Sequence, residues 1–179
     1  MLKLETERLL IRAFTEEDAV FILRLLNEPS FIQHIADKGV RTLDQARAYL
    51  REGPLQSYAA NGHGLCGVAL RETGALIGMC GLIKRDQFPD VDLGYAFLPE
   101  FWRQGYALEA AKAVLQAGEQ ALALKKTIAL VSPDNAASIR LLIKLGYRFS
   151  KNILIGLDDP GTAVYERDLF PNDLPASLI

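Results

Sequence analysis

The sequence predicts a single α/β domain, also described as α+β, in which about four helices flank one central twisted sheet. Two observations predict this fold class. Three apolar runs between residues 65 and 98 follow one another at short intervals, as in an antiparallel meander. After residue 106, helical and extended patterns alternate, which makes the sheet mixed but mostly antiparallel. Because the 179 residues show no repeat, low-complexity segment or linker, one domain is expected over residues 1–179.

The composition is typical of globular proteins and excludes several function classes. Half of the residues are hydrophobic and the net charge is −2, so the basic excess of nucleic-acid binders is missing. Cys66, Cys80 and two histidines make neither a disulfide framework nor a zinc site, so we expect buried thiols and no metal. The first residues carry acids where a secretion signal is apolar, and no apolar run reaches the roughly 20 residues of a membrane span. We therefore expect a cytoplasmic protein without a nucleic-acid or membrane partner.

Residues 1–55 predict one strand and two helices. A strand is expected at residues 8–14, followed by a helix that Thr15 opens with a variant of the capping box and that Pro29 stops. Thr42 begins the second helix, because Gln45 can reach back to its amide, and this helix is expected to end before residues 53–54, Gly-Pro. The apolar positions that give the two helices a buried face are Ala19, Ile22, Leu23 and Leu26, and Ala46, Tyr49 and Leu50.

The middle of the chain predicts the antiparallel meander. Residues 65–71 and 75–83 are two apolar runs, and the short connection between them contains Gly74, which can adopt the positive φ that such turns need. Residues 92–98 form a third run after a polar segment that is expected to be a surface turn.

The last third of the chain predicts two further helices and three further strands. In residues 107–124 polar positions recur at helical spacing among alanine, valine and leucine, which predicts a long, largely buried helix. Asn135 begins a helix that ends at Leu145, with Gly146 as a left-handed cap. Strands are expected at 127–132, 147–151 and 162–168, so the core covers about residues 4–168 and a tail covers 169–179.

The turn before the longest helix has the composition of an anion-binding site. The first N–H groups of that helix have no intrahelical partner, Gly105 lets the main chain approach a ligand, and the small Ala107 leaves room for an anion. A pyrophosphate could therefore bind the N–H groups of Gln104, Gly105, Tyr106, Ala107 and Leu108, with Arg103 as a further phosphate partner. Alone, the turn is equally compatible with an ordinary helix start, and it matches neither GxGxxG nor the P-loop motif.

Four stretches together carry a specific resemblance over nearly the whole chain. They are residues 4–12, residues 92–95, residues 99–111, and residues 132–138 with 144–147. These stretches resemble the GNAT superfamily of N-acetyltransferases, and within it the branch of the ribosomal-protein N-terminal acetyltransferases (RimJ/RimL-like). In the superfamily pattern (Gln or Arg, two residues, Gly, one residue, Gly or Ala), the chain matches at Gly105 and Ala107. It carries Trp102 at the first position, where we expect packing rather than ligand contact.

The resemblance implies that acetyl-CoA is the co-substrate and lies in a V-shaped split between the fourth and fifth strands of the family's sheet, here residues 92–98 and 127–132. Backbone groups near Phe97, Leu98 and Pro99 would line its pantetheine arm. Asn135 would hydrogen-bond the same arm, and Ser138, one helical turn further, would face the sulfur. Asparagine and serine also suit helix capping, which remains the alternative role for both.

The resemblance and the chemistry of amines indicate the catalytic candidates. Direct transfer needs a neutral amine and a donor for the departing thiolate. Asp92, where relatives often have a glutamate, is the first candidate for a base acting through water, and a solvated carboxylate is its alternative role. Leu142 occupies the position of a tyrosine acid in many members of the superfamily, so Ser138 is the expected substitute. His63 is a weaker candidate for the base, because a histidine in a glycine-rich turn is usually exposed.

The sequence therefore predicts acetyl-CoA-dependent N-acetylation of an amine acceptor. A peptide or protein N-terminus is the first choice and a small-molecule amine the second. Two other hypotheses remain open at this stage, an acyl-CoA-binding sensor without turnover and a phosphate-binding regulator unrelated to CoA. A monomer and a homodimer are both compatible with the sequence.

Overall fold

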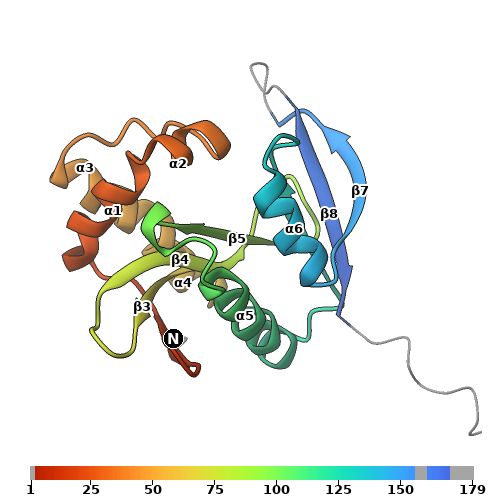
Figure 1. The fold of residues 1–179 in the computed structure, drawn as a ribbon, viewed down its shortest axis with the longest axis horizontal. Helices are drawn as coiled ribbons and strands as arrows, with labels where there is room; N and C mark the ends of the chain where they lie inside the picture. Colours follow the sequence, from red (N-terminus) through yellow and green to blue (C-terminus); the bar gives the residue numbers. More distant parts are fainter. Residues whose placement is uncertain (1–2, 156–160, 170–179) are drawn as a thin grey trace, which may run out of the picture.

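The computed structural model describes residues 3–155 and 161–169, and these contain one eight-stranded sheet (Figure 1). Its order is β1-β2-β3-β4-β5-β6-β8-β7, and every neighbouring pair is antiparallel except β5 with β6. The predicted mixed, mostly antiparallel sheet is therefore confirmed. The strands are β1 (Lys3–Glu5), β2 (Leu9–Arg12), β3 (Leu65–Leu70), β4 (Leu76–Ile83), β5 (Val91–Phe97), β6 (Lys126–Val131), β7 (Arg148–Ile153) and β8 (Thr162–Asp168).

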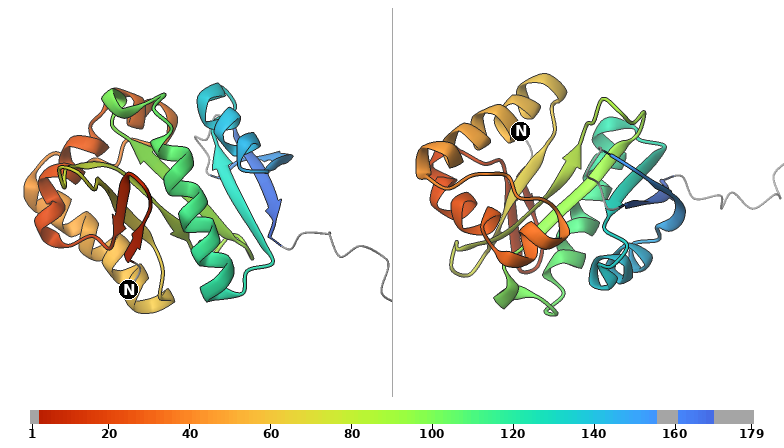
Figure 2. Two further views of the ribbon diagram at one scale, coloured as in Figure 1. Left: turned by 60° about the horizontal axis from the view of Figure 1, so that its bottom comes forward. Right: turned by 90° about the horizontal axis from the view of Figure 1, so that it is seen from above.

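Helices cover both faces of this sheet (Figures 1 and 2). The α-helices are α1 (Ala19–Leu26), α2 (Pro29–His34), α3 (Leu43–Leu50), α4 (Gln56–Asn61), α5 (Tyr106–Leu122) and α6 (Ala136–Lys144). Apolar residues of α1, α2 and α3 pack with Met79 and Ala96 on one face, which we call the α1–α3 face. Apolar residues of α5 and α6 pack with Leu93 and Phe97 on the other, the α5–α6 face. Alternate side chains of β5 therefore point to opposite faces, as the pleat of a strand requires.

The predicted caps agree with the structure. The N–H of Gln45 donates to Thr42 Oγ1 at 3.2 Å, and the N–H of Thr42 donates to Gln45 Oε1 at 3.0 Å. Gly74 and Gly146 have φ angles of +73° and +86°, the left-handed conformation expected at the hairpin and at the end of α6. These features depend only on neighbours in the chain, which is why the sequence reveals them.

The two prolines of the N-terminal helices lie within helical segments rather than ending them. Pro29 does not stop a helix but begins α2, because the first position of a helix needs no N–H donor. Helix α3 ends at Leu50, before residues 53–54 as expected, but a π-helical turn (Arg51–Leu55) carries the chain on through Pro54 into α4. The short strand β1 was not predicted either. Of the predicted tail at 169–179, only Leu169 lies within the described residues, and it is buried.

The sheet opens between its two parallel strands. β5 and β6 share only two residue pairs, Val91 with Thr127 and Asp92 with Ile128, although β5 continues to Phe97 and β6 to Val131. Beyond Asp92 the two strands therefore no longer pair, and the predicted split between the strands at 92–98 and 127–132 is confirmed. In the part of the chain described here, no helix combines the length and the hydrophobicity needed to cross a membrane.

Candidate functional site

The edge of β5 that faces the split carries main-chain groups that pair with no neighbouring strand beyond Asp92. The N–H of Leu98 donates to Ile77 O on β4, so the main-chain groups of Phe97 and Tyr95 point to the opposite edge, toward the split. The Phe97 carbonyl accepts a hydrogen bond from Trp102 Nε1 at 2.7 Å. Trp102 is 46% exposed, and its indole ties the turn to the end of β5. An extended ligand with amide groups could pair with this edge as an added strand does.

The turn between β5 and α5 presents free N–H groups. Gly105 has a φ of +84°, and the first main-chain hydrogen bond of α5 runs from the N–H of Glu109 to Gly105 O at 3.0 Å. Within residues 3–155 and 161–169, the N–H groups of residues 104–108 donate to no other protein group. The structure therefore provides the unpartnered donors that the sequence predicts at a helix start, in a geometry that suits an anion.

Arg103 occupies a strained position in this turn. Its φ of +60° lies in the left-handed region, which costs a residue with a Cβ atom about 1 kcal/mol. We expect Arg103→Gly to unfold in urea with a free energy about 1 kcal/mol higher than that of Arg103→Ala, because both lose the guanidinium and only glycine relieves the backbone. Equal unfolding free energies of these two variants would contradict a strained Arg103.

The split is bridged by a hydrogen bond between Tyr95 and Ser138. Tyr95, on β5, places its hydroxyl 2.6 Å from Ser138 Oγ in the first turn of α6. Asn135 caps that turn, because its Oδ1 accepts the N–H of Ser138 at 3.0 Å. The capping role considered for Asn135 is thus present, and it uses only the oxygen of the side-chain amide. Ser138 does not act as a cap through its hydroxyl, which points to Tyr95 instead.

Tyr95 is the residue that sequence reasoning missed. Burial raises the pKa of its hydroxyl, so Tyr95 is protonated at neutral pH and can donate a hydrogen bond. Leu142, which we expected at the position of a tyrosine acid, is buried in the core. The signal available in the sequence was the position of Tyr95 on the same strand as Asp92. Because the two residues lie an odd number of positions apart, their side chains point to opposite faces of the sheet. Its partner, however, is 43 residues away and follows another strand.

Asp92 is not the solvated carboxylate that we considered as the alternative. It is 2% exposed, lies 2.7 Å from Arg85 Nε, and accepts a hydrogen bond from the N–H of Leu130. Burial raises its pKa, although the ion pair with Arg85 opposes this effect. Because side chains alternate along β5, Asp92 points to the α1–α3 face and Tyr95 to the α5–α6 face. An acid and a base could thus reach the split from opposite sides.

His63 lies outside this arrangement. It is 7% exposed and its Nδ1 is 2.9 Å from Leu82 O, so the expectation of an exposed histidine is wrong. Cys66 and Cys80 are buried free thiols, as predicted. Within residues 3–155 and 161–169, no group of three or more His, Cys, Asp or Glu residues is placed to hold a metal ion.

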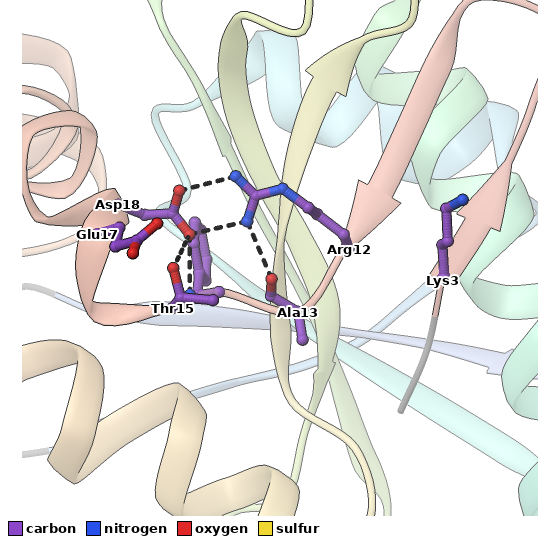
Figure 3. A pocket seen from close by; sticks show the side chains of 7 residues that line it. Lys3, Arg12, Ala13, Thr15, Glu17 and Asp18 are labelled. Carbon is purple, nitrogen blue, oxygen red and sulfur yellow. Dashed lines mark hydrogen bonds and ion pairs between the residues drawn. The ribbon is translucent and has the colours of Figure 1, made fainter.

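A pocket of about 380 Å³ lies elsewhere, between β2 and the beginning of α1 (Figure 3). Both terminal nitrogens of Arg12 bind the carboxylate of Asp18, at 2.8 and 2.7 Å, and Asp18 also accepts the N–H of Thr15. The guanidinium and the carboxylate satisfy each other, so this pair fastens β2 to the helix start. The open strand edge and the free N–H groups are at the split, which we therefore take as the functional site.

Comparison with known proteins shows the family of the chain. The acetyltransferase (GNAT) domain family matches residues 8–148. The uncharacterized N-acetyltransferase YoaA of Bacillus subtilis (strain 168) is 33% identical over 150 residues, which are 81% of this chain and 82% of that protein. An acetyltransferase from Agrobacterium tumefaciens str. C58 is 26% identical with a TM-score of 0.78, covering 93% and 94% of the two chains. RimL, a ribosomal L7/L12 α-N-protein acetyltransferase in complex with coenzyme A, has a TM-score of 0.80 at 13% identity, covering 91% and 95%, and is similar in fold alone.

Proposed function

The chain belongs to the acetyltransferase (GNAT) domain family, and from that premise we propose that it transfers an acetyl group from acetyl-CoA directly to an amine in the β5–β6 split. The observation that carries the proposal is the open edge of β5, which leads from the Tyr95–Ser138 pair to the free N–H groups at the start of α5. A thioester, an amide-bearing arm and a pyrophosphate follow one another in acetyl-CoA in the same order.

We assign the parts of acetyl-CoA to these groups. The pyrophosphate accepts hydrogen bonds from the N–H groups of residues 104–108, and the positive end of the α5 dipole adds about 0.3–1 kcal/mol. The pantetheine amides pair with the main chain of Tyr95 and with the N–H of Phe97, whose carbonyl already accepts the Trp102 indole. The side-chain amide nitrogen of Asn135 remains a donor to the same arm, because capping occupies only Oδ1. The thioester then lies near Ser138.

The reaction is an attack of the amine nitrogen on the thioester carbonyl carbon. A C–N bond forms, the C–S bond breaks, and the sulfur leaves with the electron pair. The nitrogen loses its proton to Asp92 through water, on the α1–α3 face. The sulfur takes the proton of the Ser138 hydroxyl, which Tyr95 holds by a hydrogen bond on the other face, and Ser138 recovers a proton from solvent. The amine acceptor therefore binds on the side of the split that helices α1 to α3 cover.

A peptide or protein N-terminus is the acceptor that we favour, because Asp92 is only 2% exposed and already paired, which favours an amine that needs little help from a base. Its carboxylate is already engaged by Arg85 and by the N–H of Leu130. An α-amino group with a pKa of about 7.7–8.0 is roughly a fifth to a third neutral near pH 7.4, whereas a lysine amine near 10.4 is only about 0.1% neutral. The similarity in fold to RimL, named for α-N-acetylation of a protein, supports this RimL-like assignment. A small amine of low pKa is the second candidate.

The test is a panel of acceptors, with release of the CoA thiol from acetyl-CoA as the measurement. The main comparison uses two peptides of the same sequence. One has a free N-terminus and a blocked lysine side chain, and the other has a blocked N-terminus and a free lysine side chain. We expect turnover with the free N-terminus. Preference for the lysine peptide would reject the N-terminal assignment, and absence of turnover with every peptide and small amine would reject the proposal.

We further expect the effect of Asp92→Asn to depend on the acceptor. The substitution keeps the size of the side chain and removes the base, so kcat/KM should fall by about tenfold or less for an α-amine. It should fall by roughly 100-fold for an amine of lysine-like pKa, which needs a base. The pH profile gives the second readout, since activity of the variant should recover as pH rises toward the pKa of the acceptor. An equal fall for both acceptors would contradict Asp92 as the base.

A further inference from the structure

We infer that Arg8 is a positioning residue that holds the pyrophosphate-binding turn in its binding conformation, together with Thr6 and Glu109. The inference rests on the proposed placement of acetyl-CoA. Arg8 and Thr6 lie about 100 positions before the turn in the sequence and do not belong to the turn itself.

The Arg8 side chain joins three parts of the turn. Its Nη1 donates to Gln104 O at 2.9 Å, and its Nε and Nη2 each lie 2.7 Å from Glu109 Oε2. The guanidinium carbon stands 4.4 Å from the centre of the Tyr106 ring, a cation–π contact. A Cβ atom added to Gly105 would come within 3.3 Å of Arg8 Nη2. One rigid, planar group therefore contacts three of the residues from 104 to 109, and a side chain at Gly105 would crowd it.

Glu109 is held from the same segment by two more hydrogen bonds. Thr6 Oγ1 donates to Glu109 Oε1 at 2.6 Å and the N–H of Arg8 donates to the same atom at 3.0 Å. Burial alone would raise the pKa of Glu109, but the hydrogen bonds from Thr6 and Arg8 outweigh it, so the pKa lies below its usual value. Glu109 is therefore ionised at neutral pH.

The ionised carboxylate of Glu109 lies in the first turn of α5, and it needs the ion pair with Arg8 if a phosphate is to bind beside it. Its side chain is only 19% exposed and lies next to the N–H groups that we assign to the pyrophosphate. An unpaired carboxylate there would repel a phosphate, whereas the ion pair with Arg8 cancels its charge. Arg8 thus orders Gln104 and Gly105 and also removes the repulsion from Glu109. Neither effect requires Arg8 to touch the ligand.

The experiment compares two acetyl donors with one acceptor. Acetyl-CoA carries the pyrophosphate, and S-acetyl-pantetheine lacks it. We expect wild type to prefer acetyl-CoA by roughly 100-fold in kcat/KM, and Arg8→Lys to lose about tenfold or more of that preference while it turns over S-acetyl-pantetheine like wild type. Lysine keeps the charge but cannot contact Gln104 and Glu109 together. Glu109→Gln weakens the hold on Arg8 but also removes the carboxylate that would repel a phosphate, so it should lose a smaller part of the preference.

Arg71→Lys is the matched control. Arg71 holds the same N-terminal segment, since its Nη1 donates to Thr6 O at 2.7 Å, and it is similarly exposed, but it makes no contact with residues 102–109. Its preference for acetyl-CoA should equal that of wild type. Full preference in both Arg8→Lys and Glu109→Gln would overturn the inference, and so would an equal loss with both donors, which indicates a general folding defect. A wild type without preference would overturn the proposed pyrophosphate site itself.

Discussion

Ala107→Glu is expected to abolish acetyl-CoA binding while the protein stays folded. Ala107 lies in the first turn of α5, among the N–H groups that we assign to the pyrophosphate. A carboxylate there meets the negative phosphates, and repulsion between like charges costs several kcal/mol, so the Kd should rise by more than about 100-fold. The fold should tolerate the change, because an acid near a helix N-terminus is favoured by about 0.3–1 kcal/mol. The variant should therefore lose affinity for acetyl-CoA without losing stability.

Calorimetric titration and thermal unfolding measure these two effects. With acetyl-CoA at about 100 times its Kd, wild type should gain roughly 2.7 kcal/mol of stability, and the variant should gain none. Ala117→Glu is the control, since it adds the same charge to the same helix, at a similarly half-buried position far from its beginning. Binding by Ala107→Glu as tight as that of wild type would move the donor site elsewhere.

Tyr95→Phe is expected to reduce kcat by about 100-fold, within the range of a general acid. The phenylalanine keeps the ring but loses the hydroxyl, 2.6 Å from Ser138 Oγ, that holds Ser138 toward the departing sulfur. Ser138→Ala should have an effect at least as large. Because the two hydroxyls act as one unit, the double variant should be no slower than Ser138→Ala alone. The Kd of acetyl-CoA should stay near the wild-type value in all three.

Tyr147→Phe is the matched control for Tyr95→Phe. Tyr147 is also buried, burial also raises its pKa, and its hydroxyl is 2.8 Å from Thr127 Oγ1. This variant loses a hydrogen bond of the same kind from the core, so it should lose stability and keep kcat. Two results would remove Tyr95 from the mechanism: a kcat near wild type in Tyr95→Phe, or an equal fall of kcat in Tyr147→Phe.

The strands and helices that the sequence predicts are those with a local cause. The capping box of Thr42 and the left-handed glycines Gly74 and Gly146 act within a few residues, and the structure confirms them. Pro29 and Pro54 behave differently from what the residue type alone indicates, since both lie within helical segments. A proline is compatible with the first position of a helix and with a π-helical turn, and the packing of the surrounding chain selects between these outcomes.

The candidate site also has parts that the sequence could predict and parts that it could not. The turn at residues 104–108 and the helix start at Asn135 are continuous in the chain, so their composition already indicates an anion and a cap. The partner of Ser138 could not be predicted, because Tyr95 reaches it across a split that exists only once β5 and β6 diverge. Asp92 could be named as a base from its position on the strand, but its burial against Arg85 is a property of the folded chain.

The mixed sheet, most of its strands and the glycine turn at the start of the longest helix follow from periodicity and caps, which act locally and can therefore be predicted. How that turn is held depends on the folded chain. Arg8, just before β2, pairs with Glu109 on α5, and such a contact depends on chain segments about 100 positions apart meeting in space. Side chains on one short strand point alternately to two faces, so the fold also decided that Asp92 and Tyr95 flank the split from opposite sides.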